Sequence, residues 1–289
     1  MTESSASGDD FLCVCGVTKV YDGTRIGRIV AVESIDLAVK RGEFVSVIGP
    51  SGCGKSTLLM MMGGMQHSSS GTITIGGKLV EGPMPDRAAF VFQDYTLFPW
   101  RSVVANVEVG LQFRGMRKSL RREMAMKYLN LVNLTGFADA YPAELSGGMQ
   151  QRVAIARALS LQPDVLLMDE PFGALDEQMR TVLGDELLKI FAKTGQTVVF
   201  VTHSLSEAIY LSDRIVVMTS RPGKIKEVLT VPAARPREAA FVTSDLFNDL
   251  RKRLFTLLNE EAQAAARLEM AERNTAEPAG FAAAAKLSC

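Results

Sequence analysis

The sequence has no excess of charge of either sign and no long apolar run. Its 289 residues carry 32 Lys and Arg against 32 Asp and Glu. Proteins that clamp nucleic acid depend on a surplus of basic side chains, so this balance argues against a nucleic-acid partner. A membrane helix needs roughly 18 or more consecutive apolar residues. The apolar runs here, such as 165–168 and 198–201, have only the length of strands.

The positions of the histidines and cysteines argue against a structural metal site or a disulfide framework. The histidines are His67 and His203, and the cysteines are Cys13, Cys15, Cys53 and Cys289. The first two cysteines are expected on one face of a strand, and no second Cys or His pair completes a zinc site. The first ten residues lack the basic and apolar segments of a secretory signal. The chain is therefore expected to stay in the compartment where it is made.

The sequence does contain strand patterns that alternate with helical patterns. Strands expected at 165–168, 197–202 and 214–218 each follow a helical segment, which predicts a parallel α/β sheet. The apolar runs 44–48 and 88–92 suit strands that are buried on both faces. Further strands are expected at 11–20, 29–39, 71–75 and 78–80, the last two as a hairpin. Amphipathic or charged helical stretches are expected at 102–132 and 245–273.

The strongest motif is a glycine-rich loop after the expected strand 44–48. The segment GPSGCGKST matches G-x-x-x-x-G-K-[ST] and lies between a buried strand and a helix, as that pattern requires. Glycines let backbone N–H groups turn toward a phosphate, and the helix N-terminus attracts the anion. Lys55 would reach the β- and γ-phosphates, and the Ser56 hydroxyl would bind Mg²⁺. The predicted phosphate-binding residues are Gly49, Pro50, Ser51, Gly52, Cys53, Gly54, Lys55, Ser56 and Thr57.

Cys53 has two interpretations within this loop. It can contribute only its backbone, or its thiol can have a lowered pKa beside Lys55 and a helix N-terminus. The first interpretation is the simpler one, because the phosphate cradle uses backbone groups.

Two carboxylates end the expected strand 165–168. Asp169 and Glu170 would lie at the carboxyl edge of the sheet, where open α/β sheets bind ligands. Neighbouring side chains of a strand face opposite ways, so the two acids should have different roles. Asp169 fits the Mg²⁺ shell, and Glu170 fits the base that polarises the attacking water. A solvated strand end is the alternative, and the phosphate loop upstream favours the catalytic interpretation.

A third motif connects the other two with one family. LSGGMQQR at 145–152 stands between the phosphate loop and VLLMDEP, and this order resembles the ATP-binding-cassette (ABC) ATPases. The resemblance covers about residues 11–230. It implies ATP hydrolysis on an α/β P-loop NTPase core with a parallel sheet, an N-terminal antiparallel β-subdomain and an inserted helical subdomain. The implied division is a disordered N-terminus at 1–10, an ATPase domain at 11–240 with the helical subdomain at about 95–160, and a C-terminal helical extension and tail at 241–289.

The resemblance also implies roles for residues outside the three motifs. Gln93 matches the glutamine that joins the metal shell and senses the membrane partner. His203 matches the histidine that contacts the γ-phosphate, although a histidine at a strand end is often only structural. Tyr21 matches the aromatic residue that stacks on adenine, and a core tyrosine is the alternative. The implied catalytic residues are Glu170, His203, Lys55 and Gln93, and the implied metal ligands are Ser56, Gln93 and Asp169.

Family members work as head-to-tail dimers in which each chain completes the other's ATP site. The resemblance therefore implies a second ATP-binding subunit, most simply a second copy of this chain. Helix N-termini supply donors and partial positive charge to the facing γ-phosphate. The residues implied to act across the interface are Ser146, Gly147, Gly148, Gln150 and Asp176.

The segment after Gln93 is similar to one group within the family. This segment resembles the matching part of importers of nitrate, taurine and aliphatic sulfonates. It comprises QDYTLFPWRSV and the following Ala105, Asn106 and Val107. Two later segments are similar to the C-terminal part of the same importers: SRPGK at 220–224 and RPR at 235–237. Trp100, the single tryptophan, either fills a gap in the helical subdomain or lines a groove for a helix of the membrane permease.

This similarity implies an ATPase on the cytoplasmic face of the inner membrane that energises uptake of a small anionic solute. A separate permease would carry the solute, and a periplasmic solute-binding protein would act indirectly. A cassette for another solute, or for an exporter, is the main alternative. Chromosome-maintenance ATPases are excluded because only residues 58–144 separate the loop from the signature. A single nucleotide site argues against translation-associated cassettes.

Overall fold

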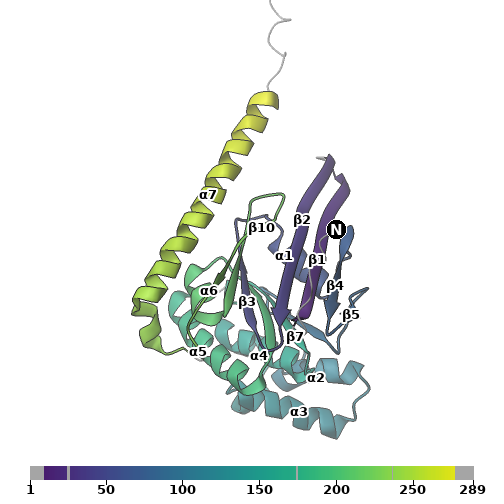
Figure 1. The fold of residues 1–289 in the computed structure, drawn as a ribbon. Helices are drawn as coiled ribbons and strands as arrows, with labels where there is room; N and C mark the ends of the chain where they lie inside the picture. Colours follow the sequence, from purple (N-terminus) through teal and green to yellow (C-terminus); the bar gives the residue numbers. More distant parts are fainter. Residues whose placement is uncertain (1–9, 25–26, 174, 236, 277–289) are drawn as a thin grey trace, which may run out of the picture.

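The computed structural model describes residues 10–24, 27–173, 175–235 and 237–276. At its centre is a six-stranded sheet with the order β10-β9-β3-β8-β7-β6 (Figure 1). Neighbouring strands are parallel except for β10, which is antiparallel to β9. This arrangement confirms the predicted parallel α/β sheet. The strands are β3 (Phe44–Ile48), β6 (Ala88–Val91), β7 (Val165–Asp169), β8 (Thr197–Val201), β9 (Arg214–Met218) and β10 (Ile225–Thr230).

The parallel strands are largely apolar because both faces of the sheet are covered. Alternate side chains point to opposite faces, so each strand contributes to two cores. On one face, Val45 and Leu167 belong to a core with α1 (Lys55–Met62) and the antiparallel sheet. On the other face, Phe44 and Phe200 belong to a core with the remaining helices. The ring centroids of Phe44 and Phe200 lie 5.7 Å apart in that second core.

A separate four-stranded antiparallel sheet has the order β2-β1-β4-β5. Its strands are β1 (Asp10–Thr24), β2 (Gly27–Lys40), β4 (Ser70–Ile75) and β5 (Lys78–Leu79). The expected hairpin is present between β4 and β5, where Gly76 and Gly77 both have positive φ angles, of 55° and 73°. That backbone conformation suits a two-residue hairpin turn and favours glycine. Figure 1 shows β1 and β2 as a long ribbon beside the central sheet.

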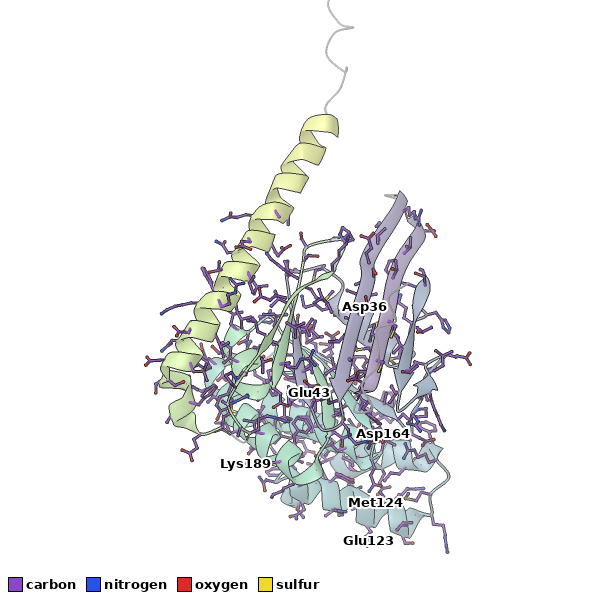
Figure 2. The ribbon with its side chains drawn as sticks, viewed as in Figure 1. Asp36, Glu43, Glu123, Met124, Asp164 and Lys189 are labelled. Atoms are coloured by element: carbon purple, nitrogen blue, oxygen red, sulfur yellow. The ribbon has the colours of Figure 1, made fainter. Side chains whose placement is uncertain are left out.

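The helical part of the chain contains α2 (Val103–Phe113), α3 (Lys118–Leu131) and α4 (Gly147–Ser160), with short 3₁₀ turns η1 (Thr135–Phe137) and η2 (Pro142–Glu144). The helical stretch expected at 102–132 is therefore two helices. It is interrupted near Gly115, whose φ of 73° cannot continue a right-handed helix. Figure 2 labels Glu123 and Met124 on α3, at the end of the molecule away from the β1–β2 ribbon.

The C-terminal part contains α5 (Glu177–Thr194), α6 (Leu205–Leu211), the turn η3 (Ala239–Thr243) and α7 (Asp245–Ala276). Figure 1 shows α7, in yellow, running beside β10 and past the end of the sheet. Strand β10 was not predicted, because charged residues break its apolar pattern. These charges face α7: Lys226 pairs with Glu261 at 2.8 Å, and Glu227 pairs with Arg253 at 2.7 Å.

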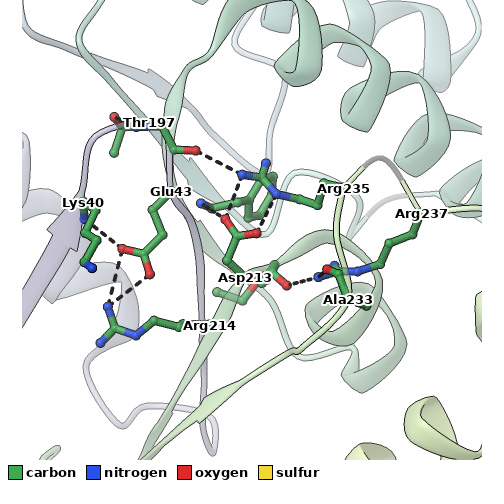
Figure 3. A network of polar contacts seen from close by, with 12 residues as sticks. Lys40, Glu43, Thr197, Asp213, Arg214, Ala233, Arg235 and Arg237 are labelled. Atoms are coloured by element: carbon green, nitrogen blue, oxygen red, sulfur yellow. Dashed lines mark hydrogen bonds and ion pairs between the residues drawn. The ribbon is translucent and has the colours of Figure 1, made fainter.

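The segment between β10 and η3 is bound to the core by two arginines (Figure 3). Arg235 Nη2 lies 2.7 Å from Asp213 Oδ2 and donates to the carbonyl of Gly42 at 3.0 Å. Arg237 is only 7% exposed. Its guanidinium donates to four backbone carbonyls, those of Ile209, Tyr210, Ser212 and Ala233. Burial lowers the pKa of Arg237 to about 10.

We expect Arg237→Ala to lower the free energy of unfolding by about 3 kcal/mol, because the substitution leaves buried carbonyls without their donor. Denaturant unfolding would measure this loss. Arg253→Ala is the control, since Arg253 forms an exposed ion pair and exposed pairs contribute little. Equal unfolding midpoints for Arg237→Ala and the wild-type chain would contradict the structural role of Arg237.

The predicted division into terminal segments and an ATPase domain stays a prediction. Residues 1–9 and 277–289 lie outside the described ranges. Within those ranges, no helix combines the length and the apolar composition that crossing a membrane requires.

Candidate nucleotide-binding site

The predicted phosphate and acid residues gather at one edge of the central sheet. The glycine-rich loop follows β3, Glu170 follows β7, and His203 follows β8. Figure 2 labels Glu43 and Asp164, which directly precede β3 and β7 and so mark the opposite edge. A pocket of about 500 Å³ opens at the carboxyl edge. Its lining comprises Tyr21, Ile29, Ala31, Ser51, Gly52, Gly54, Lys55, Ser56, Thr57, Glu170 and Arg221.

The glycine-rich loop packs tightly against β2. Gly54 has a φ of 100° and precedes the first residue of α1. A Cβ atom at this position would lie 2.5 Å from Val32 Cγ1 and 2.9 Å from the carbonyl oxygen of Ala31. Both the backbone conformation and the space therefore require glycine. Because the loop ends at the α1 N-terminus, its backbone N–H groups and the helix dipole favour an anion.

Lys55 lies along the loop and is almost buried, with 8% of the residue exposed. Its ammonium donates to the carbonyl oxygens of Gly49 and Pro50, each at 2.9 Å. These bonds hold the positive charge inside the cradle that the loop forms. Cys53 lies next to it but is buried, and burial raises the pKa of the thiol. The thiol pKa is thus raised, which contradicts the alternative of a lowered pKa; desolvation outweighs the charge of Lys55.

Ser56 and Asp169 provide a pair of hard oxygen donors. The Ser56 hydroxyl donates to Asp169 Oδ1 at 3.0 Å, across 113 positions of sequence. Burial raises the pKa of Asp169, and the neighbouring charge of Glu170 adds to the effect; together they outweigh the Ser56 hydrogen bond and the charge of Lys55. A hydroxyl and an underneutralised carboxylate suit Mg²⁺, which prefers oxygen ligands. The residues present therefore fit a magnesium ion.

Glu170 lines the pocket, and His203 lies beside it. His203 Nδ1 is 3.1 Å from Glu170 Oε2. Glu170 has a positive φ of 45°, unusual for a residue with a side chain, and its N–H donates to the carbonyl of Val201 at 2.9 Å. Backbone strain of this kind is concentrated at functional sites. The strand ends thus hold a base and an imidazole close together, as proton transfer requires.

Behind His203 lies a polar network that sequence reasoning missed. The Thr202 hydroxyl donates to Glu207, and Glu207 Oε1 lies 3.5 Å from Arg180 Nη1. Arg180 also donates to the carbonyls of Leu175 and Gly173. Burial raises the pKa of Glu207. The network joins the loop before Asp176 to Thr202, the residue before His203. The one signal for it in the sequence is the position of Glu207, four residues after His203.

Tyr21 lies in the wall of the pocket with Ile29 and Ala31. Its hydroxyl accepts a hydrogen bond from Gln66 Nε2 at 2.6 Å, which fixes the ring. An aromatic ring beside aliphatic side chains suits a flat heterocyclic base.

The structure does not bring the other predicted residues to this pocket. Gln93 is exposed and lines a second pocket, near Gly173, together with Gln150. The side chain of Gln150 donates to the carbonyls of Pro142 and Leu145. Ser146 begins α4 and Asp176 begins α5, where each side chain accepts a hydrogen bond from the helix backbone. Ala174, two positions before Asp176, lies outside the described residues.

Comparison with known proteins gives a consistent result. The family model described as "ABC transporter" matches residues 32–173. An uncharacterized ABC transporter ATP-binding protein of Methanocaldococcus jannaschii is 50% identical over 250 residues, covering 86% of this chain and 92% of that protein. The bicarbonate transport ATP-binding protein CmpD of Synechococcus elongatus is 44% identical over 252 residues, covering 86% of this chain and 90% of that protein. The nitrate import ATP-binding protein NrtD of a Synechocystis species is 46% identical over 218 residues, covering 75% of this chain and 81% of that protein.

A solved structure of an ATP-binding cassette has the same fold. It is a dimer in a post-hydrolysis state bound to ADP and phosphate, with a TM-score of 0.68 and 34% sequence identity. The match covers 77% of this chain and all of that one. With the phosphate cradle, the paired acids and these relatives taken together, the chain belongs to the ABC transporter family, as an ATP-binding subunit that hydrolyses ATP.

Proposed function

We propose that this chain is the ATP-hydrolysing subunit of an importer, and that it energises uptake of a small anionic solute through a separate permease. The proposed class of solute rests on the similarity to proteins named for bicarbonate transport and nitrate import. The segment 93–107 supports the same group, as the sequence similarity to nitrate, taurine and sulfonate importers implies.

The pocket suggests how the chain's residues divide the reaction. Lys55 and the backbone N–H groups of the loop bind the β- and γ-phosphates of ATP. Ser56 and Asp169 would hold Mg²⁺, which when bound would neutralise charge on the phosphate oxygens. Glu170 accepts a proton from the attacking water, and His203, 3.1 Å away, contacts the γ-phosphate and orients that carboxylate. Tyr21 stacks on adenine. Gln93 would join this site only after moving from its present pocket.

Two copies of the chain would complete each site, with Ser146, Gly148 and Asp176 of one copy facing the ATP of the other. The N-terminus of α4 supports this, because Ser146 is exposed there and the helix dipole is suited to a γ-phosphate. The dimeric state of the solved cassette supports the same arrangement. A homodimer needs no further gene product and is the simplest form.

The permease would bind beside the helical part of the chain. A pocket of about 390 Å³ is lined by Gln93, Leu97 and Pro99. Trp100 follows these residues and is 72% exposed, so it does not fill a gap in the helical part. An exposed tryptophan next to a pocket is typical of a contact for a partner helix. Gln93 lies in the same pocket, which would let the permease act on a residue of the ATP site.

We expect Trp100→Ala to reduce assembly with the permease, measured by copurification from membranes, because the change removes the largest exposed aromatic surface at the pocket. Phe255→Ala is the matched control. Phe255 is also exposed, at 62%, but it lies on α7. Normal assembly and transport with Trp100→Ala would contradict the docking role of Trp100.

Gene disruption in the host tests the solute class. Uptake of labelled nitrate, bicarbonate or taurine should fall when the gene is deleted, and the wild-type gene should restore it, whereas a Glu170→Gln gene should not. Loss of uptake of an unrelated solute, or loss of export, would favour the alternative cassette. In the proposed assembly the chain lies on the cytoplasmic face of the inner membrane, and a periplasmic binding protein delivers the solute to the permease.

A further inference from the structure

The loop after β9 packs directly against the phosphate loop. Gly223 stands so close that a Cβ atom there would lie 2.0 Å from the carbonyl oxygen of Cys53. The Gly223 N–H donates to the carbonyl of Ala31 at 3.0 Å, and its carbonyl accepts from the N–H of Glu33 at 2.9 Å. The loop 220–223 therefore joins β2, which carries one wall of the pocket, to the phosphate cradle.

Arg221 extends from this loop into the nucleotide pocket. Its Nη2 donates to the carbonyl of Gly52 at 3.1 Å, and the side chain lines the pocket together with Ser51 and Lys55. Lys55 and Arg221 are the two cationic side chains in that lining. A guanidinium has five N–H donors, so one bond to Gly52 leaves several for phosphate oxygens.

The same loop is attached to the C-terminal helix. Glu261 Oε2 on α7 accepts from the Ser220 N–H at 2.9 Å and from the Ser220 hydroxyl at 3.4 Å. Glu261 also pairs with Lys226 at 2.8 Å and is largely buried, with 12% of its side chain exposed. Burial raises the pKa of Glu261, but the bonds from Lys226 and Ser220 outweigh this and leave the pKa below its usual value. The carboxylate is therefore held as a charged acceptor directly before Arg221.

We propose that Arg221 is a phosphate-binding residue of the ATP site and that Glu261, by holding Ser220, positions it. The C-terminal helix thereby sets the affinity for ATP, although it lies outside the segment 32–173 that the family model matches. This inference rests on the nucleotide site proposed above. Arg221 binds the nucleotide directly, whereas Glu261 is a positioning residue that acts through the loop.

The first experiment measures binding of a fluorescent ATP analogue to the full-length chain. Arg221→Ala should raise its Kd roughly tenfold, the equivalent of one charge-assisted contact. Arg221→Lys should recover part of the affinity, because it restores the charge without the fork of donors. Thermal unfolding shows whether each variant is folded. An unchanged Kd for folded Arg221→Ala would overturn the role of Arg221.

The second experiment separates positioning from general loss of charge on α7. Glu261→Ala should raise the KM for ATP roughly threefold with little change in kcat, and Glu261→Gln should raise it less, because the amide oxygen still accepts from Ser220. Glu260→Gln is the matched control. Glu260 pairs with the same lysine, at 2.7 Å, but no described contact joins it to Ser220.

The outcomes of the second experiment are distinct. A KM raised equally by Glu260→Gln and Glu261→Gln, or a loss confined to kcat, would overturn the positioning role of Glu261. Failure of the wild-type chain to bind the ATP analogue would instead contradict the nucleotide site itself. A raised Kd in Arg221→Ala and a raised KM in Glu261→Ala, with wild-type binding intact, would support both links from α7 to the phosphate loop.

Discussion

Glu170→Gln is expected to bind ATP with normal affinity and to hydrolyse it about 10²- to 10⁴-fold more slowly. Glutamine occupies the same space but cannot take a proton from the attacking water. The neighbouring His203 would keep its position, since an amide oxygen can still face its Nδ1 atom. With ATP bound and not consumed, the chain should accumulate as a dimer. Phosphate release and size-exclusion chromatography in the presence of ATP would measure the two effects.

Glu81→Gln is the control for this experiment, because Glu81 is an exposed glutamate on the loop after β5. It should leave both hydrolysis and the dimer equilibrium unchanged. Turnover at the wild-type rate in Glu170→Gln would show that the base is another group. Slow turnover without any dimer would support the role of Glu170 but argue against ATP as the ligand that joins the two copies.

Lys55→Ala is expected to weaken ATP binding roughly 100-fold or more, because two charge-assisted phosphate contacts are lost together. The lysine is almost buried in the cradle and holds the carbonyls of Gly49 and Pro50. Removal of its ammonium leaves a phosphate site that relies on backbone donors, the α1 dipole and the proposed contact from Arg221. Calorimetric titration with ATP and Mg²⁺ would give the affinity directly.

Lys55→Arg should not restore this function, because a planar guanidinium needs more room than the cradle gives to a residue that is 8% exposed. Lys78→Ala, at an exposed position of the hairpin, is the control and should bind ATP normally. Full activity of Lys55→Ala would refute the assignment of the phosphate loop.

Much of the nucleotide site is local in the sequence, and this is why it could be predicted. The segment 49–57 is continuous, and a strand followed by a helix leaves little choice about where its backbone N–H groups point. Asp169 and Glu170 are predictable for the same reason, since the end of a parallel strand lies at the ligand-binding edge. Fold, sheet type and the hairpin at Gly76 and Gly77 follow from patterns of similarly short range.

Other features depend on contacts between distant segments, which no local pattern reveals. Strand β10 has an interrupted apolar pattern because its charges pair with α7, so it resembles a loop in the sequence. The break between α2 and α3 depends on one glycine. Arg221 lies 169 positions from Gly52, and the link from Arg180 to Glu207 likewise joins two elements.

The sequence by itself determined the glycine-rich phosphate loop and placed two acids, Asp169 and Glu170, at the end of a parallel strand. Only the tertiary structure decided which side chains share a pocket. It placed Arg221 and Tyr21 at the nucleotide site, left Gln93 in a neighbouring pocket, and connected α7 to the phosphate loop through Glu261. The physical reason is the distance along the sequence over which each interaction acts. Backbone conformation and periodicity act over a few residues, whereas packing and ion pairs join whatever the fold brings together.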